Sequence, residues 1–497
     1  MAKFKVLLLY PNLQMVNLLP SNIAVLSACL KQAGFEVKLF DTTLYRTTDK
    51  SVDDIRVEHM QLRPFNLKEK GVDYKQTDIF SDFSGLVSAY KPDLIGMSAT
   101  DDTYELGMEL ISGVRDFSKA HVIIGGIYPK FSPDATLTHP AVDSICIGDG
   151  EKSLAELCRK IAEGKDITAI RNLWVKKEGK VFKNKPELSD INSLPYDDFS
   201  VFEDVRFFRP MQGKIFRMVP VMLDRGCPFQ CSFCAAPSLK KFYQDSGAGE
   251  YFRVKTVDRI MDEIKHYVAV YKADYIYFNT ETFFARPDKE LELFFKRYIA
   301  EVGLPFWCQT RIETVTDARA KILKDMNCDR ISIGLEHGNE DFRKKMLKKN
   351  FTNKQAVEAF EILHKNKIAV TVNNMIGFPD ETRELAFDTI KLNRQIKADS
   401  INAYFFVPYS GTPLRDYCLE KGYFSSDVKT DSLMKRSVLG MPQFTPDQIK
   451  GLVRTFPLYI KMPESYFPRI RQAEELTEVG DKILTELRAL YFEGYFK

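Results

Sequence analysis

The sequence predicts an α/β protein: a doubly wound, Rossmann-like parallel sheet, then a partial (β/α)6 barrel of the TIM type, then a helical C-terminal region. Short apolar, β-branched runs alternate with helical patterns over residues 1–165. A second alternation, with a period of roughly thirty residues, fills residues 218–413. Strands that alternate with helices form parallel sheets covered by helices. Residues 166–217 are expected to connect these two domains, and residues 414–497 to form a helical domain.

Composition restricts the class of protein before any motif is considered. Hydrophobic residues make up 44% and charged residues 28% of the 497 positions, which is ordinary for a soluble globular protein. The net charge of +3 does not indicate a nucleic-acid partner. No apolar run approaches the roughly eighteen residues of a membrane span. Six of the nine cysteines are scattered singly, which indicates a reducing, cytoplasmic compartment.

The first domain is expected to bind a ligand at one edge of its sheet. The predicted strands are residues 5–10, 36–40, 94–98, 122–126 and 144–148, and the predicted helices are residues 21–32, 104–117 and 151–163. Ligands of such sheets bind beyond the carboxyl ends of the strands, where small residues allow close approach to the backbone. The polar segment 42–92 is predicted to be an excursion that covers the sheet edge or a cofactor.

The connector and the barrel follow from the same kind of pattern. Within the connector a β-hairpin is predicted at residues 173–182, before a segment rich in Pro and Asp. The predicted barrel strands are residues 218–223, 275–279, 305–309, 330–335, 369–373 and 400–406, and the helices between them include residues 257–270, 288–302, 317–325, 354–365 and 383–396. Barrel chemistry collects at the carboxyl ends of the strands.

Three cysteines directly after the first barrel strand carry the strongest signal. Cys227, Cys231 and Cys234 have C-x3-C-x2-C spacing, and Phe233 precedes the last of them. A closed zinc site would need a fourth ligand, whereas a four-iron cluster on three cysteines leaves one iron open. A zinc knuckle or three incidental buried thiols are the alternatives. This motif resembles that of radical S-adenosylmethionine (SAM) enzymes, in which the open iron of a [4Fe–4S] cluster chelates SAM.

In that setting the first domain is similar to the cobalamin-binding domain of cobalamin-dependent radical SAM enzymes. The Gly125-Gly126 turn and the Gly148-x-Gly150-Glu151 ending carry this resemblance. The Asp-x-His-x-x-Gly motif, whose histidine ligates cobalt in other cobalamin proteins, is missing. A fold that has lost cobalamin is the alternative. The resemblance implies a cobalamin site formed by Asn12, Ser98, Thr100, Gly125, Gly126, Tyr128, Gly148, Gly150 and Glu151.

The resemblance also implies SAM contacts at the barrel rim. The expected contacts are Phe233, Glu281, Arg311, Glu336 and Asn374. A charge on the rim is costly unless it meets a partner or a ligand. The alternative is a structural salt bridge between Arg311 and one of the acids. His337 is open to an acid–base role, but a histidine that merely hydrogen-bonds its neighbours fits equally well. No residue is assigned a catalytic role.

The activity implied by the family is radical methylation. Reductive cleavage of SAM gives a 5′-deoxyadenosyl radical that takes hydrogen from an unactivated carbon, and methylcobalamin then delivers the methyl group. The alternatives are a radical cyclase or rearranging enzyme, a methylthiotransferase, and a non-catalytic cobalamin-binding protein. An external donor such as flavodoxin or ferredoxin is implied. The substrate is left open among small molecules, lipids and peptides. The aromatic run 455–461 is interpreted as core, with a substrate pocket as the alternative.

Overall fold

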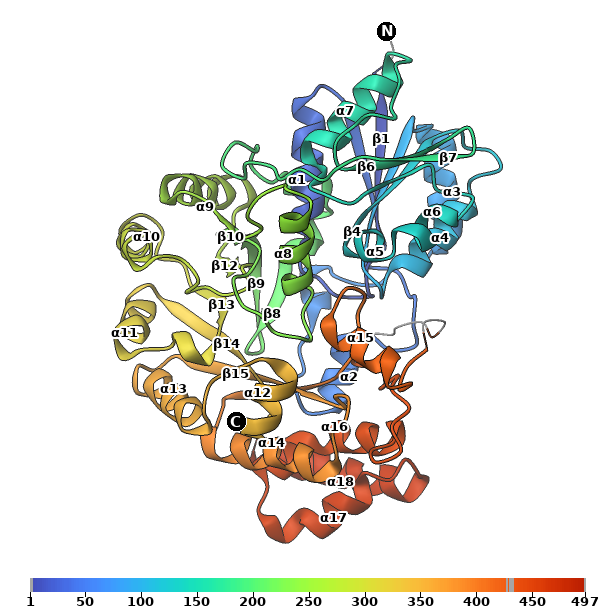
Figure 1. The fold of residues 1–497 in the computed structure, drawn as a ribbon. Coiled ribbons are helices and arrows are strands. Elements are labelled where there is room, and N and C mark those ends of the chain that lie inside the picture. Colours follow the sequence, from blue (N-terminus) through green and yellow to red (C-terminus); the bar gives the residue numbers. More distant parts are fainter. Residues whose placement is uncertain (1–2, 426–427, 429–432, 496–497) are drawn as a thin grey trace.

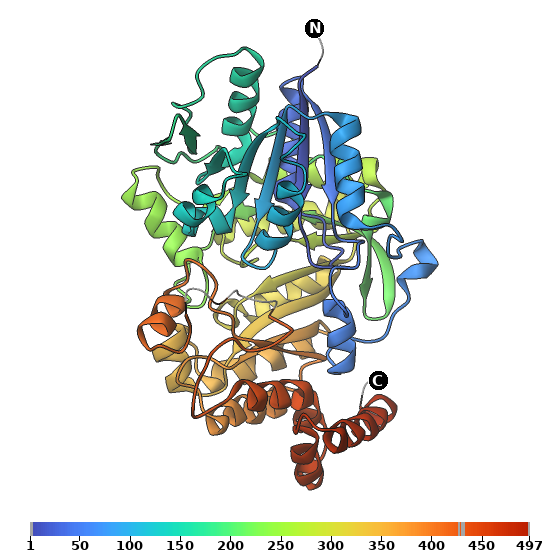
Figure 2. The same cartoon turned by 90° about the vertical axis from the view of Figure 1, so that its right-hand side faces the viewer.

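The computed structural model describes residues 3–425, 428 and 433–495. Two seven-stranded sheets dominate it, one above the other (Figures 1 and 2). The first sheet belongs to the N-terminal part of the chain and lies at the top of both views. The second sheet forms a partial barrel below it. The chain is therefore an α/β protein built as two layered units with helices added at the C-terminus.

The first sheet has the order β2-β1-β3-β4-β5-β6-β7. Its strands are β1 (Lys5–Tyr10), β2 (Glu36–Asp41), β3 (Leu94–Ala99), β4 (His121–Gly126), β5 (Ser144–Cys146), β6 (Leu173–Lys177) and β7 (Lys180–Lys183). Strands β1 to β5 are parallel, and the β6–β7 hairpin adds two antiparallel strands at one edge. The hairpin that we predicted within the connector thus extends the first sheet.

Helices cover both faces of this sheet, as a doubly wound topology requires. They include α1 (Ser21–Gln32), α3 (Ile79–Tyr90), α4 (Tyr104–Ser112), α5 (Ile127–Phe131), α6 (Pro133–Thr138) and α7 (Gly150–Ala162). Two separate cores result, one on each face of the sheet. In β1, for example, Leu8 faces one core and Leu9 the other, because successive side chains of a strand point to opposite faces.

The segment 42–92 is more regular than we predicted. Its second half is the crossover helix α3, which buries Phe83 and Val87 against the first sheet. The polar residues that precede α3 obscured the helical spacing of its apolar residues. The first half, with α2 (Val52–Glu58) and η1 (Leu67–Lys70), reaches the second sheet. There Nε2 of Gln61 donates to the carbonyl oxygen of Ala403 (3.1 Å), and the amide of Ala403 donates to Oε1 of Gln61 (3.2 Å). Ala403 belongs to the edge strand of the second sheet, so Gln61 covers part of an edge that would otherwise be open.

The second sheet has the order β16-β15-β14-β13-β12-β9-β8. Its strands are β8 (Phe208–Met211), β9 (Lys214–Val221), β12 (Tyr275–Phe278), β13 (Phe306–Thr310), β14 (Cys328–Glu336), β15 (Ala369–Ile376) and β16 (Ser400–Phe405). Six of them, β9 and β12 to β16, run parallel. Strand β8 is antiparallel to β9. The predicted partial barrel of six βα units is confirmed, with one extra edge strand.

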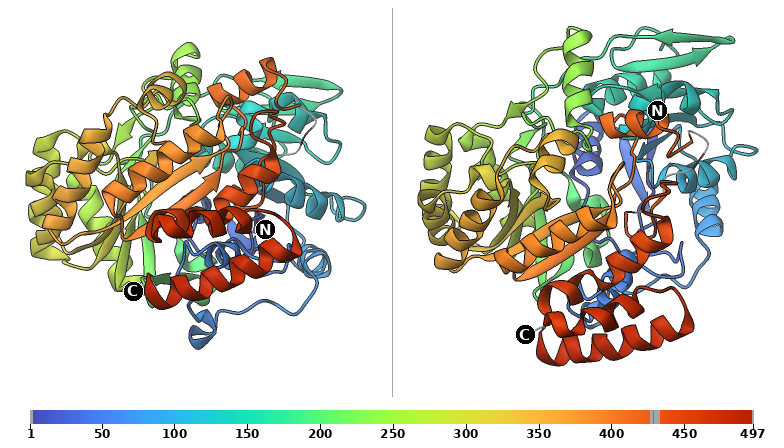
Figure 3. Two further views of the ribbon diagram at one scale, coloured as in Figure 1. Left: turned by 90° about the horizontal axis from the view of Figure 1, so that it is seen from below. Right: turned by 60° about the horizontal axis from the view of Figure 1, so that its bottom comes forward.

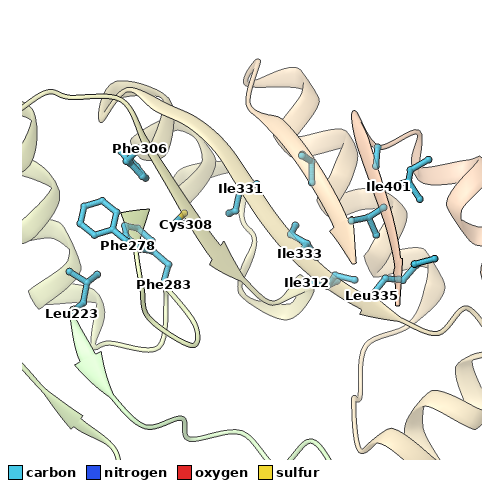
Figure 4. Close-up of a cluster of buried hydrophobic side chains, with 14 of the residues drawn as sticks. Leu223, Phe278, Phe283, Phe306, Cys308, Ile312, Ile331, Ile333, Leu335 and Ile401 are labelled. Carbon is cyan, nitrogen blue, oxygen red and sulfur yellow. The ribbon is translucent and has the colours of Figure 1, made fainter. Parts of the chain in front are cut away.

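The outer face of the barrel sheet is packed against helices. These are α9 (Val257–Tyr271), α10 (Asp288–Glu301), α11 (Asp317–Asp325), α13 (Asn353–Lys365) and α14 (Arg383–Ile396), and two further helices, α8 (Ala236–Asp245) and α12 (Glu340–Leu347), follow β10 (Asp224–Arg225) and β14. Figure 4 shows apolar side chains from alternate strand positions, such as Phe306, Cys308, Ile331 and Ile333, gathered in this core. The positions between them face the inside of the barrel.

Helices α15 (Pro413–Glu420), α16 (Pro446–Lys461), α17 (Phe467–Ala473) and α18 (Glu478–Gly494) complete the chain. In Figure 3 the last three lie across the lower side of the barrel. Helix α16 packs on β16 and α14, with Phe456 and Tyr459 fully buried, which agrees with our interpretation of this run as core. In the part of the chain that the structure describes, no helix is long and apolar enough to cross a membrane.

Candidate functional site

The cysteine loop lies between β10 and α8, above the barrel strands. Strand β10 pairs with β11 (Arg253–Val254), which fixes the entry to the loop. Gly226 has φ +98°, and a Cβ there would lie 2.8 Å from the carbonyl oxygen of Tyr251. Only glycine fits such a turn. Inside the loop, Ser232 donates to the carbonyl oxygen of Met346 at the end of α12 (2.5 Å) and accepts from the amide of Leu414 (3.0 Å). The loop is therefore held from both sides.

The three thiols share one neighbourhood. Burial raises the pKa of Cys234 to about 12, and the nearby Glu281, Cys231 and Cys227 add to this shift. Burial also raises the pKa of Cys227. No three His, Cys, Asp or Glu side chains among the described residues surround a single metal position. A [4Fe–4S] cluster does not require that, because each cysteine binds a different iron.

Arg311 is aimed at the loop from the end of β13. Its Nη1 donates to the Sγ of Cys231 at 2.9 Å, its Nη2 binds Glu313 at 2.6 Å, and its guanidinium lies 4.0 Å from the ring centre of Phe229. The guanidinium therefore fixes the position of the Cys231 side chain. The structural salt bridge that we considered, between Arg311 and Glu281 or Glu336, is not formed, and Arg311 pairs with Glu313 instead.

Glu336 occupies a strained position at the end of β14. Its φ is +65°, which is unusual for a residue other than glycine, and the pairing of β14 with β15 shifts register beside it. The residue is 8% exposed, and Lys349 donates to its Oε1 at 3.2 Å and to the carbonyl oxygen of Gly334 at 2.6 Å. Strain of this kind persists where the surrounding structure holds it, often at binding sites.

The other residues that we predicted at the SAM site lie in different surroundings. Glu281 is exposed near the cysteine loop, where the neighbouring protein raises the pKa of its carboxyl by desolvation. Phe233 is partly buried, 6.3 Å from the Phe378 ring. Asn374 is fully buried and turned to the helices, with its amide hydrogen-bonded to Asn393. The structure does not bring Asn374 into the site.

His337 is a structural residue by its contacts. Its Nε2 lies 3.1 Å from Glu381, and its Nδ1 accepts from the amide of Asn339 at 3.0 Å. Glu381 in turn accepts from the amides of Gly377 (2.5 Å) and Phe378 (3.0 Å). This fully buried chain of hydrogen bonds ties together the ends of β14 and β15 and leaves the imidazole no free nitrogen for acid–base work.

A cavity of about 280 Å³ lies between the first sheet and the barrel-domain residues that flank the cysteine loop; we call it the interdomain cavity. Small residues at the strand ends and apolar side chains of α1 and α7 form one side of it. Arg225, Tyr243 and Tyr251 from the barrel domain form the other. The six predicted cobalamin residues that line it are Ser98, Gly125, Gly126, Gly148, Gly150 and Glu151.

The remaining three predicted cobalamin residues are engaged elsewhere. Asn12 donates through Nδ2 to Thr43 (2.8 Å) and to the carbonyl oxygen of Val16 (3.0 Å), so it organises the loop after β1. Thr100 is exposed and bonded to Thr103. Tyr128 stacks on Tyr104 at 4.1 Å. The structure does not place these three side chains in the interdomain cavity.

An ionic network joins the two domains across this cavity. Arg225, two residues before Cys227, binds Glu151 at 2.6 Å and Asp149 at 3.4 Å. Arg253 of β11 binds Asp149 at 2.8 Å. Asp149 and Glu151 lie within the segment 148–151 that we assigned to cobalamin; we call this ionic network the interdomain clamp, because it also holds the residues that lead into the cysteine loop.

Sequence reasoning missed several of these residues. Asp149 lies within the Gly148-x-Gly150-Glu151 segment, and Arg225 lies two residues before the first cysteine of the C-x3-C-x2-C motif. Their ion pair joins positions 76 residues apart, so the sequence around either residue does not indicate it. Lys349 follows a helix rich in charge, where nothing distinguishes it. Lys130, which donates to the Tyr243 hydroxyl at 2.9 Å and lines the interdomain cavity, likewise has no partner nearby in sequence.

Comparison with known families decides the identity of both units. Residues 222–392 match the Radical SAM superfamily, and residues 66–158 match the B12 binding domain. The chain is a radical SAM protein with a B12-binding domain. Its cofactors are a [4Fe–4S] cluster, SAM and cobalamin.

The radical SAM protein has methyltransferases and a cyclase among its relatives. It is 25% identical over 382 residues to an uncharacterized methyltransferase of Pyrococcus horikoshii, covering 76% of this chain and 80% of the relative. It is 23% identical to the anaerobic magnesium-protoporphyrin IX monomethyl ester cyclase of Rubrivivax gelatinosus (81% and 66%) and 25% identical to bacteriochlorophyllide d C-12(1)-methyltransferase of Chlorobaculum tepidum (60% and 61%). The match thus spans less than two thirds of the latter two relatives.

Two solved structures share the whole fold. The radical SAM methyltransferase TsrM from Kitasatospora setae, with cobalamin and a [4Fe–4S] cluster bound, superposes with a TM-score of 0.67 at 15% identity, covering 99% of this chain and 100% of that chain. The cobalamin-dependent SAM radical enzyme OxsB, with aqua-cobalamin and SAM bound, gives 0.66 at 16% identity, covering 99% and 71%. The order of sheet, partial barrel and C-terminal helices is therefore a known architecture.

The residues present fit these cofactors in kind. Three thiols in one loop beside a guanidinium suit a cluster with three cysteine ligands. A cavity lined by glycines and apolar side chains leaves room for part of a large organic cofactor against the sheet. At Gly150 a Cβ would approach Leu26 to 3.3 Å on the wall of this cavity, so even a methyl group there would be tightly packed.

Proposed function

We propose that the protein removes a hydrogen atom from an unactivated carbon of its substrate and attaches a methyl group there. When bound, the cluster with SAM supplies the radical chemistry, and cobalamin supplies the methyl group. The observation that carries the proposal is the position of Arg225. This residue lines the interdomain cavity of the B12-binding domain and stands two residues before the first cysteine of the cluster loop. Both cofactors would thereby face the same space.

The chain's own residues then have separate tasks. Cys227, Cys231 and Cys234 would hold the cluster, and Arg311 would orient the Cys231 sulfur. Glu336 presents a carboxylate at a strained strand end, which suits the ammonium group of SAM. Residues 1–165 would carry cobalamin and residues 218–413 the cluster and SAM. The interdomain clamp would keep these two parts in register.

Each turnover would consume two SAM molecules. One accepts an electron from an external donor such as flavodoxin or ferredoxin and leaves as methionine and, after taking the substrate hydrogen, 5′-deoxyadenosine. The other gives up its methyl group and leaves as S-adenosylhomocysteine, and a second electron from the donor would be needed to make the cobalamin able to accept that methyl group. The two products therefore report the two halves of the reaction independently.

The test is to load the full chain anaerobically with cluster and cobalamin, add SAM and a strong reductant, and quantify both products by mass spectrometry. We expect both, with S-adenosylhomocysteine formed only when cobalamin is present. The C231S variant should form neither, and C29S, which changes a thiol in α1, should match the wild type. Failure of cluster-loaded protein to form 5′-deoxyadenosine would contradict the proposal.

Ring formation is the second candidate function, supported by the relationship to the cyclase of Rubrivivax gelatinosus. Such an enzyme would use the same hydrogen abstraction without transferring a methyl group. It would form 5′-deoxyadenosine with no cobalamin-dependent S-adenosylhomocysteine. The same measurement therefore separates the two candidates.

A further inference from the structure

A second cavity, of about 640 Å³, lies on the inner face of the barrel sheet; we call it the barrel cavity. Its walls come from strand positions that alternate with the apolar core positions, such as Trp307, Gln309, Ser332 and Thr371. The β8–β9 hairpin, the segment that follows α2 and the end of α18 complete it. The inner face of this sheet is thus polar where its outer face is apolar.

The barrel cavity is strongly cationic. Its lining contains the six basic residues Arg56, Arg63, Arg209, Arg330, Lys397 and Lys461 and one acidic residue, Asp399. Six positive charges around one cavity repel one another unless an anion enters, because a low-dielectric wall screens them poorly. Some of these charges have local partners: Arg56 binds Asp53 at 3.1 Å, and Lys461 donates to the carbonyl oxygen of Ala398 at 2.7 Å.

Arg330 and Arg209 form no ion pair with a carboxylate of the described residues, although Asp399 and Asp329 lie near Arg330 and Asp53 lies near Arg209. Arg330 is 8% exposed, and its hydrogen-bond partners are two neutral hydroxyls, those of Thr371 (2.9 Å) and Ser400 (3.0 Å). Arg209 has no side-chain hydrogen bond or ion pair with any residue in the described ranges, and its Nη1 is buried. Its guanidinium lies 5.4 Å from the Trp307 ring. Burial lowers the pKa of both arginines, yet a guanidinium stays protonated in proteins.

Other buried arginines of this chain have a carboxylate or several backbone and amide oxygens as partners. Arg206 forms an ion pair with Asp41 at 2.8 Å. Arg343 donates to the carbonyl oxygens of His337 and Phe351 (2.7 Å each) and to Asn353 (3.0 Å). A buried charge without such partners costs several kcal/mol, and a purely structural position would not need to be charged. Arg209, which has no polar partner among the described residues, and Arg330, whose partners are two hydroxyls, therefore point to a ligand that the barrel cavity receives.

We propose that the barrel cavity binds an oxyanion group of the substrate, a phosphoryl or carboxylate group, between Arg209 and Arg330. That the anion belongs to the substrate rests on the proposed function. That the cavity binds an anion rests on the residues of the barrel cavity alone. Guanidinium groups bind these oxyanions through paired N–H donors, and the Trp307 ring offers an apolar surface beside them.

The inner face connects this site to the cluster loop. Trp307 and Gln309 lie at alternate positions of β13, and Arg311 directly follows the strand and contacts Cys231. At about 3.3 Å per residue, the four steps from Trp307 to Arg311 span about 13 Å. A substrate anchored by its anion would reach the radical site with a carbon on the order of 13 Å away. The predicted substrate class is an elongated anion.

The test uses the full chain without cofactors and measures binding of inorganic phosphate and of succinate by isothermal titration calorimetry. Ionic strength is held constant with chloride, so that screening does not mimic binding. We expect saturable binding of at least one anion, and the preferred one assigns the phosphoryl or the carboxylate group. R209Q should bind at least tenfold more weakly, while R297Q, which removes a partly exposed arginine of α10 that is paired with Glu301, should bind like the wild type.

Wild-type protein that binds neither anion, or R209Q that binds as well as wild type, would overturn the proposal. Arg330 is buried, so R330Q is accompanied by a thermal unfolding measurement, and R330K serves as the charge-conserving variant. R209Q keeps the test decisive if R330Q does not fold, because the Arg209 side chain has no polar partner to lose. Anion binding without 5′-deoxyadenosine formation would refute the proposed function alone, and the converse would refute the barrel cavity alone.

Discussion

The interdomain clamp predicts that a single amide substitution in the B12-binding domain destabilises the contact with the barrel domain. In E151Q the side chain keeps its size and loses its charge. Glu151 is 4% exposed, and its Oε1 lies 2.6 Å from Nη1 of Arg225. The substitution leaves Arg225 with Asp149 alone, at 3.4 Å. Asp149 must then serve both Arg225 and Arg253.

The size of the effect follows from this geometry. Breaking a buried ion pair by removing one partner costs about 3–5 kcal/mol. Here the arginine side chain is 22% exposed and keeps one carboxylate, so we expect roughly half of that, about 2 kcal/mol. For a unit of 150–250 residues, a loss of 1 kcal/mol lowers Tm by about 2–4 °C. The expected decrease is therefore about 4–8 °C.

Scanning calorimetry on full-length E151Q measures this decrease. The control is D245N, which breaks the ion pair of Asp245 with Lys241 on α8, where both side chains are well exposed. Exposed pairs contribute about 0–1 kcal/mol, so D245N should change Tm by a few degrees at most. An E151Q decrease no larger than that of D245N would refute the reasoning, because it would mean that the clamp contributes no more than a surface pair.

Three further predictions concern the cysteine loop, the barrel rim and the first sheet. C227S, C231S and C234S should each lose cluster iron and sulfide on anaerobic loading, whereas C29S should retain both; retention of a full cluster in all three would exclude the loop as its ligand. Burial raises the pKa of Asp224 to about 7, so the folded state keeps a proton that the unfolded state releases above about pH 4, and the wild type should lose stability as pH rises from 5 to 8. D224N should therefore gain Tm relative to the wild type at pH 8 by several degrees and at pH 5 by less, and a difference independent of pH would contradict this cause. G126A should lose cobalamin from the isolated holoprotein and several kcal/mol of stability, because its Cβ would lie 2.4 Å from the carbonyl oxygen of Ala99 at φ +98°; G164A, at φ +64° in open space, should lose about 1 kcal/mol and keep cobalamin.

Much of the fold was predictable because buried parallel strands are continuous apolar runs. The six parallel barrel strands and the five parallel strands of the first sheet all carry that signal. Strand β8 and the pairing partner of the β6–β7 hairpin were not predictable, since edge strands are mixed in polarity and their register depends on distant residues. Helix α3 was missed although Phe83 and Val87 have helical spacing, because the polar segment before it hid the period.

The candidate site was likewise predictable only in part. The cysteine loop is local, and its spacing alone indicated the cluster. Asn374 shows the limit: it is one residue from Asn373, which lines the barrel cavity, and strand alternation turns it to the opposite face. A shift of one residue in register decides between a rim contact and a core hydrogen bond. Sequence patterns locate the end of a strand such as β15 only to within a few residues.

Two charged contacts connect the cysteine loop to the elements that line the interdomain cavity and the barrel cavity. Arg225 ties its first residues to the strand ends of the B12-binding domain, at 2.6 Å from Glu151. Arg311 ties Cys231 to β13, whose inner face continues to the barrel cavity. A radical reaction needs its reactive groups held in fixed positions, since a misplacement of about 1 Å costs orders of magnitude in rate. The contacts of Arg225 and Arg311 supply that positioning here. The conformation of the loop should therefore depend on what occupies each of the two cavities. Binding in either cavity would then order the same loop, and we expect cobalamin and the anion to strengthen each other's binding.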